Sequence, residues 1–472
     1  MFGFIATVSG QEFRFDPASR EAYHKSLNLQ FAEVRRSIQN PLTPQQHYVR
    51  SFAEVLELIV TEDQQLLDGY EKSFEKRTDR KTARKSADEL LLQSEIHLQW
   101  AFVYLKFGRE LDAALRFRQG FLIAEELRKS FPEYKAIYKI TGLMNVLIGS
   151  VPDKYNWILG LLNMQGSVDT GLKQLQELSA MDHDFAFEAT MWHAFIRGFI
   201  LQDPERAIAE MGKITDDNPL AVFLLANFHI KNSSSERALF YLRRLESVSR
   251  GSRIPYSFYL KGEVFLHKGD YTQAIEEYST FLRNYRGQNF VKDAHYKIGL
   301  CYWLDGRQEE AIIAFEEAEN AGKESSEADK HAARNLASGE LPSIPLTKVR
   351  FFTDGGYYRQ AEELMDEISP EMLAEKRHQV EWHYRKARLF HKQDQPEKAV
   401  PYYEKTIELA AMNEWYYAPN SCLQLGYLAR EQGNLKEARR YFEMALSYKR
   451  HEYKNSIDSK ARSALAQLKD LK

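Results

Sequence analysis

The chain has 472 residues, of which 44% are hydrophobic and 28% are charged, a composition typical of folded soluble proteins. Its 64 Lys and Arg residues against 67 Asp and Glu residues give a formal net charge of −3, so nucleic acid is not predicted as a partner. No apolar run approaches the ~18 residues that span a bilayer, so no integral membrane segment is predicted.

Residues 1–10 read MFGFIATVSG, an apolar stretch that ends in small residues before a charged sequence. Val8 and Gly10 could be the small residues before a cleavage site, with a mature start at Gln11. A preceding basic region is missing, so the stretch is interpreted as a signal-peptide remnant, with an ordinary first strand or helical turn as the alternative. The first interpretation predicts a periplasmic or secreted protein, and the second a cytoplasmic one.

Residues 11–86 are predicted to form N-terminal helices. Their end, residues 71–85, carries seven Lys or Arg and three Asp or Glu. A basic patch for an acidic partner is one interpretation, but a solvated helix end or loop is favoured because charge runs are usually exposed faces. A long helix is predicted over residues 87–107.

Self-similarity organises the rest of the chain, which is divided into repeats over 87–320, a linker over 321–348 and further repeats over 349–472. Residues 256–281 align with residues 293–318 at an offset of 37. The equivalent pairs are Gly262 and Gly299, Phe265 and Tyr302, Gly269 and Gly306, Ala274 and Ala311, and Tyr278 and Phe315. The linker is predicted because its sequence is polar at first and contains Pro342 and Pro345 near its end.

The pattern recurs elsewhere along the chain. Two strong copies contain Ala387, Phe390, Ala399 and Tyr403, and then Gly426, Ala429, Gly433, Ala438, Phe442 and Ala445. Weaker copies of the second half are centred on Ala113, Ala207, Ala238 and Ala361. Each unit is predicted to be a helical hairpin, because apolar residues recur at helical spacing, small residues allow close approach and glycine marks the turn.

These residues resemble the tetratricopeptide repeat, a helix–turn–helix unit of about 34 residues. The resemblance implies an all-α, right-handed superhelix, an α-solenoid, here with roughly ten hairpins that stack because none is stable alone. Residues 151–178 further resemble a tetratricopeptide family that includes the fungal inclusion-body clearance proteins and an animal branch, and this similarity would span residues ~85–460. The residues that carry it are Pro152, Trp157, Leu161, Leu162, Gly166 and Gly171.

Catalytic motifs are not found, and the chain is predicted not to be an enzyme. The sequence MDHD at residues 181–184, with His193 after it, could hold a metal or orient an imidazole in a hydrolase, but a capped loop is favoured. Cys301 and Cys422 are predicted to be buried thiols too far apart for a disulfide. No metal and no cofactor are predicted.

The resemblance places the inner surface on the first helix of each hairpin. The partner-binding groove is therefore predicted to be aromatic, with a few polar contacts, at Tyr256, Tyr259, Tyr296, Trp303, Tyr384, Arg388, His391, Tyr427 and Arg430. Family members that clamp a terminal carboxylate use Lys and Asn at positions where this chain has tyrosines, Glu263 or Leu300, so a carboxylate clamp is not expected. Alternatively, the tyrosines pack against the next hairpin.

The sequence thus predicts a non-enzymatic scaffold that binds a protein or peptide partner in an aromatic concave groove, because aromatic and Arg side chains dominate protein recognition. The alternative is a carrier of a hydrophobic or lipid-like ligand, suggested by the aromatic content. The sequence indicates neither the identity of the partner nor the oligomeric state.

Overall fold

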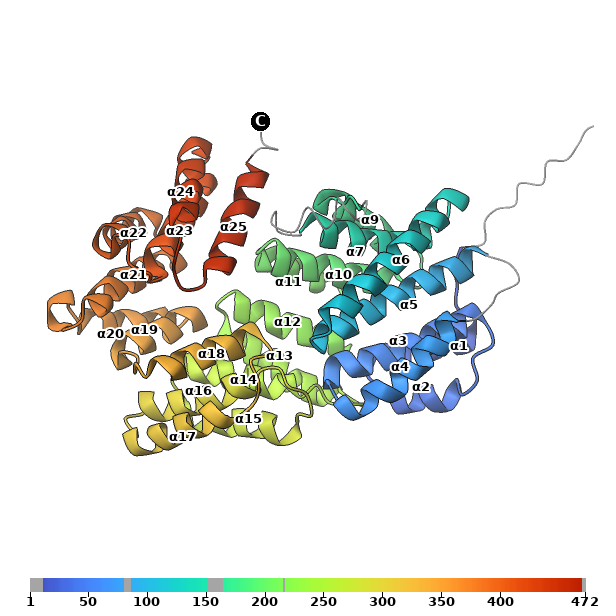
Figure 1. Ribbon diagram of the computed structural model, residues 1–472, viewed down its shortest axis with the longest axis horizontal. Helices are drawn as coiled ribbons and strands as arrows, with labels where there is room; N and C mark the ends of the chain where they lie inside the picture. The colour runs from blue at the N-terminus through green and yellow to red at the C-terminus, as the bar shows by residue number, and fades with distance from the viewer. Residues whose placement is uncertain (1–11, 80–85, 151–163, 215–216, 469–472) are drawn as a thin grey trace, which may run out of the picture. The chain divides into compact units, whose positions relative to one another are not determined.

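The computed structural model describes residues 12–79, 86–150, 164–214 and 217–468 (Figure 1). All regular secondary structure in these ranges is helical, which confirms the predicted all-α class. The possible signal-peptide remnant at residues 1–10, part of the charged run before residue 86, and Pro152, Trp157, Leu161 and Leu162 lie outside the described residues.

The chain divides into two compact units, and each is described by itself. Unit 1 comprises Met1–Gly262, Glu276–Tyr296 and Glu317–Arg334. Its complete helices are α1 (Pro17–Leu27), α2 (Phe31–Ser37), α3 (Pro44–Thr61), α4 (Gln64–Thr78), α5 (Ala87–Lys106), α6 (Glu110–Ser130), α7 (Tyr138–Gly149), α9 (Val168–Ser179), α10 (Ala186–Phe195), α11 (Pro204–Met211), α12 (Pro219–Lys231) and α13 (Ser235–Val248). The helices predicted for residues 11–86 are α1–α4.

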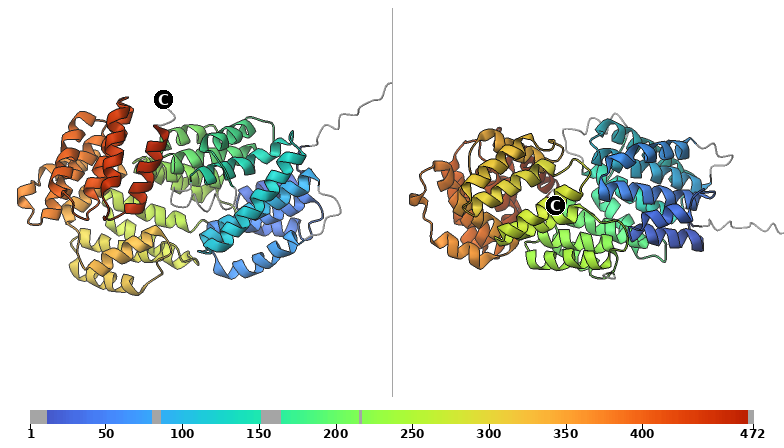
Figure 2. Two further views of the ribbon diagram at one scale, coloured as in Figure 1. Left: turned by 45° about the horizontal axis from the view of Figure 1, so that its top comes forward. Right: turned by 90° about the horizontal axis from the view of Figure 1, so that it is seen from below.

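Unit 2 comprises Glu263–Ile275, Lys297–Glu316 and Asn335–Lys472. Its complete helices are α19 (Ile344–Gly355), α20 (Tyr358–Asp366), α21 (Lys376–Lys392), α22 (Pro396–Ala410), α23 (Tyr417–Glu431), α24 (Leu435–Ser447) and α25 (Lys454–Gln467). Parts of α14 (Tyr256–Lys268), α15 (Tyr271–Asn284), α16 (Val291–Leu304), α17 (Gln308–Asn320) and α18 (Glu327–Ser338) belong to each unit. Figure 1 and the left view of Figure 2 show α21–α24 (orange to red) side by side.

The repeat pattern is confirmed by equivalent packing inside three hairpins. A Cβ atom on Gly262 would lie 2.6 Å from the ring of Tyr278, and one on Gly299 would lie 2.6 Å from the ring of Phe315. The same contact recurs between Gly426 and Phe442, at 2.4 Å. In each hairpin the first helix therefore has glycine where the second helix presents an aromatic ring sixteen residues later, because a side chain would occupy the space of the ring.

Eight hairpins share one turn geometry. In each, the residue five positions before a buried alanine of the second helix has a positive φ; these residues are Gly108, Gln202, Ser233, Gly269, Gly306, Gly356, Asp394 and Gly433. In seven of the eight, the next amide donates to a carbonyl five residues back, as from Asn434 to Ala429 at 2.8 Å, which is the Schellman bond of a helix end.

The remaining hairpin, the one with Gln202 at its turn, differs from the other seven by one residue. Asp203 donates to the carbonyl of Arg197 at 2.9 Å, six residues back, because the π-helical turn η3 (Ile196–Ile200) adds a residue to the end of the first helix.

The prediction of a linker over residues 321–348 is corrected by the structure, because α18 and the beginning of α19 form within this range. Asp329 on α18 is fully buried and accepts hydrogen bonds from the amides of Phe290 at 2.8 Å and Asp293 at 3.1 Å. Ser326 adds its amide and its hydroxyl at 3.0 and 2.6 Å. The polar composition therefore supports a helix that is tied to the start of α16 by one carboxylate.

Candidate functional site

The nine predicted groove residues all lie on first helices, but they divide between the units. Tyr256, Tyr259 and Tyr296 belong to unit 1, and the other six belong to unit 2. Each group is therefore considered by itself.

Two of the predicted groove tyrosines are interior. Tyr259 is 3% exposed and donates its hydroxyl to Asp293 of the next first helix. Tyr384 is also 3% exposed, and its hydroxyl accepts a hydrogen bond from Nδ2 of Asn420 at 2.5 Å. Both side chains thus join consecutive hairpins, as in the alternative interpretation of the sequence.

The other predicted aromatic residues of α14 and α16 are half-buried. The ring of Tyr256 stacks on that of Tyr259 with centroids 5.2 Å apart. Trp303 donates its indole N–H to the carbonyl of Pro342 at 2.9 Å, which engages the polar end of the side chain. Tyr296 is half-buried as well.

In unit 2, arginines connect consecutive first helices. Arg388 of α21 donates to Oε1 of Gln424 of α23 at 3.2 Å, and Arg430 of α23 donates to Oε1 of Gln467 of α25 at 2.8 Å. The two bonds span 36 and 37 residues, which is one repeat each. They place α21, α23 and α25 next to one another along one side of the unit.

His391 and Tyr427 lie beside these arginines. The ring of His391 is hydrogen-bonded to the hydroxyl of Tyr403 at 3.1 Å, and burial, with help from the nearby Arg388, lowers its pKa to about 4. The Arg430 guanidinium lies 5.3 Å from the centre of the Tyr427 ring. We refer to Arg388, His391, Tyr427 and Arg430, all half-buried, as the α21–α23 surface. It presents aromatic and cationic groups together with a neutral imidazole.

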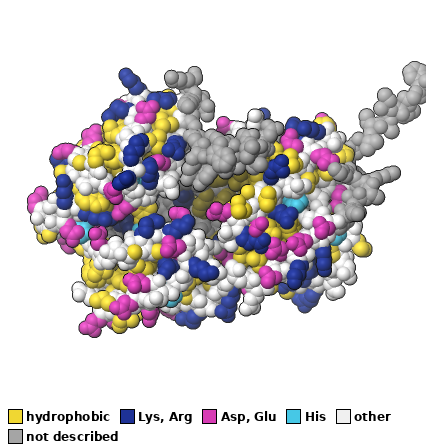
Figure 3. All heavy atoms as spheres, in the orientation of Figure 1, with side chains coloured by type: hydrophobic (Ala, Val, Ile, Leu, Met, Phe, Trp, Pro, Cys, Tyr) yellow, Lys and Arg dark blue, Asp and Glu magenta, His cyan; other side chains and the backbone are white. Residues whose placement is uncertain are grey.

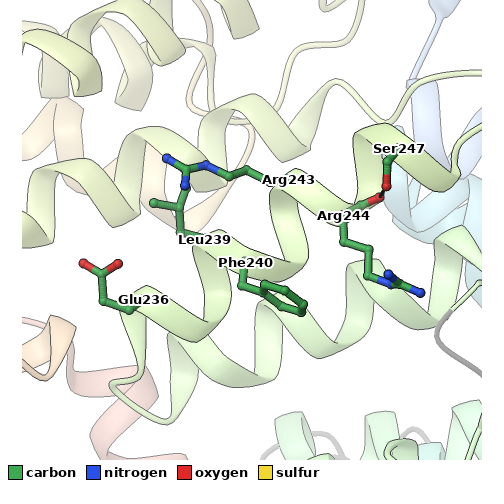
Figure 4. A pocket seen from close by; sticks show the side chains of 6 residues that line it. All are labelled: Glu236, Leu239, Phe240, Arg243, Arg244 and Ser247. Carbon is green, nitrogen blue, oxygen red and sulfur yellow. Dashed lines mark hydrogen bonds between the residues drawn. The ribbon is translucent and has the colours of Figure 1, made fainter.

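A shallow hollow of ≈ 380 Å³ lies on the outer face of α13 (Figure 4). Its lining comes from that helix alone: Glu236, Leu239, Phe240, Arg243, Arg244 and Ser247. Phe240 is 52% exposed, and Arg244 donates to Asp217 at 2.9 Å. Three of the six lining residues are charged, which does not match the predominantly apolar lining of a lipid cavity. Figure 3 shows Lys and Arg interspersed with Asp and Glu on the visible face.

The sequence did not predict a buried charged cluster in unit 1. Lys139 of α7 is 2% exposed, and its Nζ lies 3.3 Å from Oε2 of Glu95 and 3.3 Å from both carboxylate oxygens of Glu188. It also donates to Tyr48, and Tyr23 donates to Oε1 of Glu188 at 2.5 Å. We call these five residues the Lys139 cluster; they come from α1, α3, α5, α7 and α10.

The Lys139 cluster holds two carboxylates for one ammonium in a closed interior. Burial raises the pKa of Glu95 to about 7, against the lowering effect of Lys139 and with the raising effect of Glu188. None of the five residues is more than 6% exposed, so a substrate has no access to the lysine in this structure. The arrangement is suited to tie five helices together and not to catalysis. The sequence feature that could have indicated this cluster is a charged residue within an apolar stretch, as at Lys139.

Three of the residues considered for a metal or hydrolase site, His183, Asp184 and His193, have partners within the fold. His183 is 6% exposed, its Nδ1 accepts the amide of Phe185 at 3.0 Å, and burial, with help from Arg14, lowers its pKa to about 4. Asp184 accepts from Arg20 and from the amide of Phe15, both at 2.8 Å. His193 contacts Glu210 at 2.8 Å. Among the described residues, no group of three or more His, Cys, Asp or Glu side chains could hold a metal ion.

Both cysteines are free and buried in unit 2, as predicted. Burial raises the pKa of the Cys422 thiol to about 12 and that of Cys301 further. Neither thiol has the properties of a nucleophile. None of the described helices combines the length and the apolar character needed to cross a membrane.

The hairpins, with their common turn and glycine–aromatic contact, define a class of proteins built from tandem helical repeats. Models of the tetratricopeptide repeat match residues 259–326, 381–411 and 419–452. These three ranges of the chain therefore contain tetratricopeptide repeats. No curated protein matches its sequence.

Several solved structures are similar over long stretches, with low sequence identity. A human IFIT1 dimer with PPP-AAAA is 16% identical, covers 92% of this chain and 96% of its own, and has a TM-score of 0.34. A tetratricopeptide repeat protein from Parabacteroides merdae is 16% identical, with 62% and 98% covered and a TM-score of 0.23. The APC/C hetero-tetramer Cut9–Hcn1 is 11% identical, with 95% and 72% covered and a TM-score of 0.29.

Proposed function

We propose that this chain is a non-enzymatic scaffold that binds a protein partner through the α21–α23 surface. Tetratricopeptide repeats generally mediate protein–protein interactions, and two family-model matches fall on α21–α24. The observation that carries the proposal is the pair of arginine–glutamine bonds, because they align three first helices and hold Arg388 and Arg430 in fixed positions. The Arg430 side chain over the Tyr427 ring, with Arg388 on the neighbouring first helix, has the composition of interaction hot spots.

The two interior tyrosines are not part of this contact surface. Tyr259 and Tyr384 would act by holding consecutive hairpins in register. The remaining members, Arg388, His391, Tyr427 and Arg430, retain some exposure. The neutral His391 leaves the two arginines as the charged groups of the surface, so an acidic or carbonyl-rich segment suits it best.

The experiment is affinity capture from the native host with the full chain as bait. We expect a protein captured by the wild type to be lost with the double variant Arg388→Ala/Arg430→Ala and with Tyr427→Ala. Arg359→Ala is the matched control, because this arginine lies on the second helix α20 with an 81% exposed side chain. Circular dichroism verifies folding. Equal capture by all variants would refute the assignment of this surface.

The carrier of a hydrophobic ligand remains the alternative to this proposal. The hollow on α13 gives it no support, because its rim is charged. Native mass spectrometry of the purified chain tests the alternative directly, since a retained apolar ligand would appear as a discrete added mass.

A further inference from the structure

Helix α6 carries three leucines on the face that its own hairpin does not use. Leu111, Leu115 and Leu122 are 84%, 66% and 45% exposed. The buried residues of α6 are Ala113, Gly120, Ala124 and Leu127. At about 100° per residue, the leucines lie roughly opposite that buried face, within about 40° of one another. We call Leu111, Leu115 and Leu122 the α6 leucine stripe.

None of the other described second helices has apolar side chains at all three of the same repeat positions, although α13 has Phe240 and α17 has Ile313 at one of them. Counting from the buried alanine of each second helix, the stripe occupies positions −2, +2 and +9 relative to Ala113. The equivalent residues are Thr272, Glu276 and Arg283 in α15, and Lys436, Arg440 and Ser447 in α24. The stripe is thus specific to α6 and is not a property of the repeat. Exposed apolar side chains gathered on one helix face, here with the exposed Arg118 between Leu115 and Leu122, are typical of interaction sites.

The end charges of α6 are complementary to those of a second α6 in the antiparallel direction, beside the ion pairs that Asp112 makes with Arg109 and Arg128 with Glu125 in each copy. Its first turn is acidic, with Glu110 and Asp112, and its last turn is basic, with Arg128 and Lys129. Two antiparallel copies with Leu115 facing Leu122 of the partner copy bring Glu110 level with residue 127 of that copy. The acidic end of each helix then lies within about one turn of the basic end of the other.

We propose that the chain self-associates through the α6 leucine stripe, with α6 pairing antiparallel to α6 of a second copy. The pair has two-fold symmetry, so the contact between Leu115 and Leu122 is made twice. Helix α6 has 21 residues and is about 31 Å long, so one helix per copy forms a small interface. Association in the micromolar range is therefore expected.

Sedimentation equilibrium of the purified full chain, from about 1 to about 100 µM, tests the proposal. We expect the wild type to shift from monomer to dimer and the double variant Leu115→Lys/Leu122→Lys to stay monomeric. Leu42→Lys is the matched control, because Leu42 is 81% exposed but lies before α3. Both changes are at exposed positions, so folding is retained. A wild type that is monomeric throughout, or a dimer that persists in the double variant, would overturn the proposal.

Charge reversal separates self-pairing from binding of an unrelated helix. Glu110→Lys is expected to weaken the dimer at least about tenfold, and Glu110→Lys/Lys129→Glu to restore it, because each copy then meets the inverted charges of the other.

Disulfide formation tests the register: an equimolar mixture of Leu115→Cys and Leu122→Cys chains should cross-link more readily than either alone. Preferential linking of like with like would contradict the antiparallel arrangement.

Discussion

A Cβ atom added to Gly262 would lie 2.6 Å from Cε1 of Tyr278, because the tyrosine ring rests directly on the backbone of the first helix. Tyr278 is fully buried, so the ring has no free space to move into. The glycine is thus required by its neighbour and not by its own backbone conformation.

Gly262→Ala is expected to destabilise unit 1 by about 1–3 kcal/mol, since an extra methyl group in a closely packed contact forces the ring to shift. Urea denaturation followed by tryptophan fluorescence measures the change, and Trp100 is a buried reporter in the same unit. Gly69→Ala in α4 is the control: nothing lies within 4 Å of the added atom. That variant should gain up to about 1 kcal/mol from helix propensity. Equal losses in both variants would contradict the packing argument.

Gly433→Ala tests the turn separately from packing. Its φ is 77°, and an added Cβ would find nothing within 4 Å. The expected loss of about 1–2 kcal/mol is therefore purely conformational. Gly433→Asn should lose less, because asparagine tolerates this region, as does Asp394, which has a φ of 57° at the equivalent turn. Thermal denaturation of the two variants gives the comparison, and a neutral Gly433→Ala would contradict it.

The raised pKa of Glu95 leads us to predict that the free energy of unfolding depends on pH. Its pKa is about 7 in the folded chain against a reference value of 4.5, so the folded state binds this proton more tightly than the unfolded state. The stabilising effect of the proton is complete below about pH 4.5 and is lost as the pH rises to about 7. The loss amounts to roughly 3 kcal/mol.

Glu95→Gln is the variant that measures this effect, because the amide is neutral at every pH. In urea denaturation, we expect the free energy of unfolding of this variant, relative to that of the wild type, to rise by a few kcal/mol between pH 5 and pH 8. Glu188, Lys139, Tyr23 and Tyr48 are unchanged in both proteins. A difference that does not vary with pH would show that Glu95 is ionised throughout.

Lys139→Met should destabilise unit 1 by about 3–5 kcal/mol, because it leaves the buried Glu188 carboxylate without its cation. Glu95, whose pKa is already raised to about 7, responds to the loss of Lys139 by binding a proton. Adding Glu188→Gln to that variant should recover part of the loss, since one uncompensated charge is then removed. Double-mutant analysis of the urea midpoints gives the coupling. Additive losses would show that the two side chains act independently.

The sequence allowed prediction of the features that are local within a hairpin. Gly262, Ala274 and Tyr278 lie within seventeen residues, so their spacing alone predicts two close helices and the contact between them. Gly433 marks its turn for the same reason. In the copy with Ala387, an aspartate at position 394 stands where the next copy has Gly433, yet its φ is positive as well.

Features that depend on distant segments could not be predicted. The Lys139 cluster joins residues from Tyr23 to Glu188, and no spacing in the sequence links them. The groove prediction gave the helical position of Tyr259 and Tyr384, but Asp293 and Asn420, one repeat later, cover them. The polar stretch that became α18 depends in the same way on its contact with α16.

The start of α16 depends on an acceptor supplied from outside its own hairpin. Asp329 accepts the amides of Phe290 and Asp293, so a carboxylate some forty residues further along the chain performs the role that a preceding serine or aspartate would normally perform. These two amides therefore gain their side-chain acceptor only once α18 has been made. In a nascent chain that stops before α18, water must satisfy the donors that Asp329 satisfies in the folded protein.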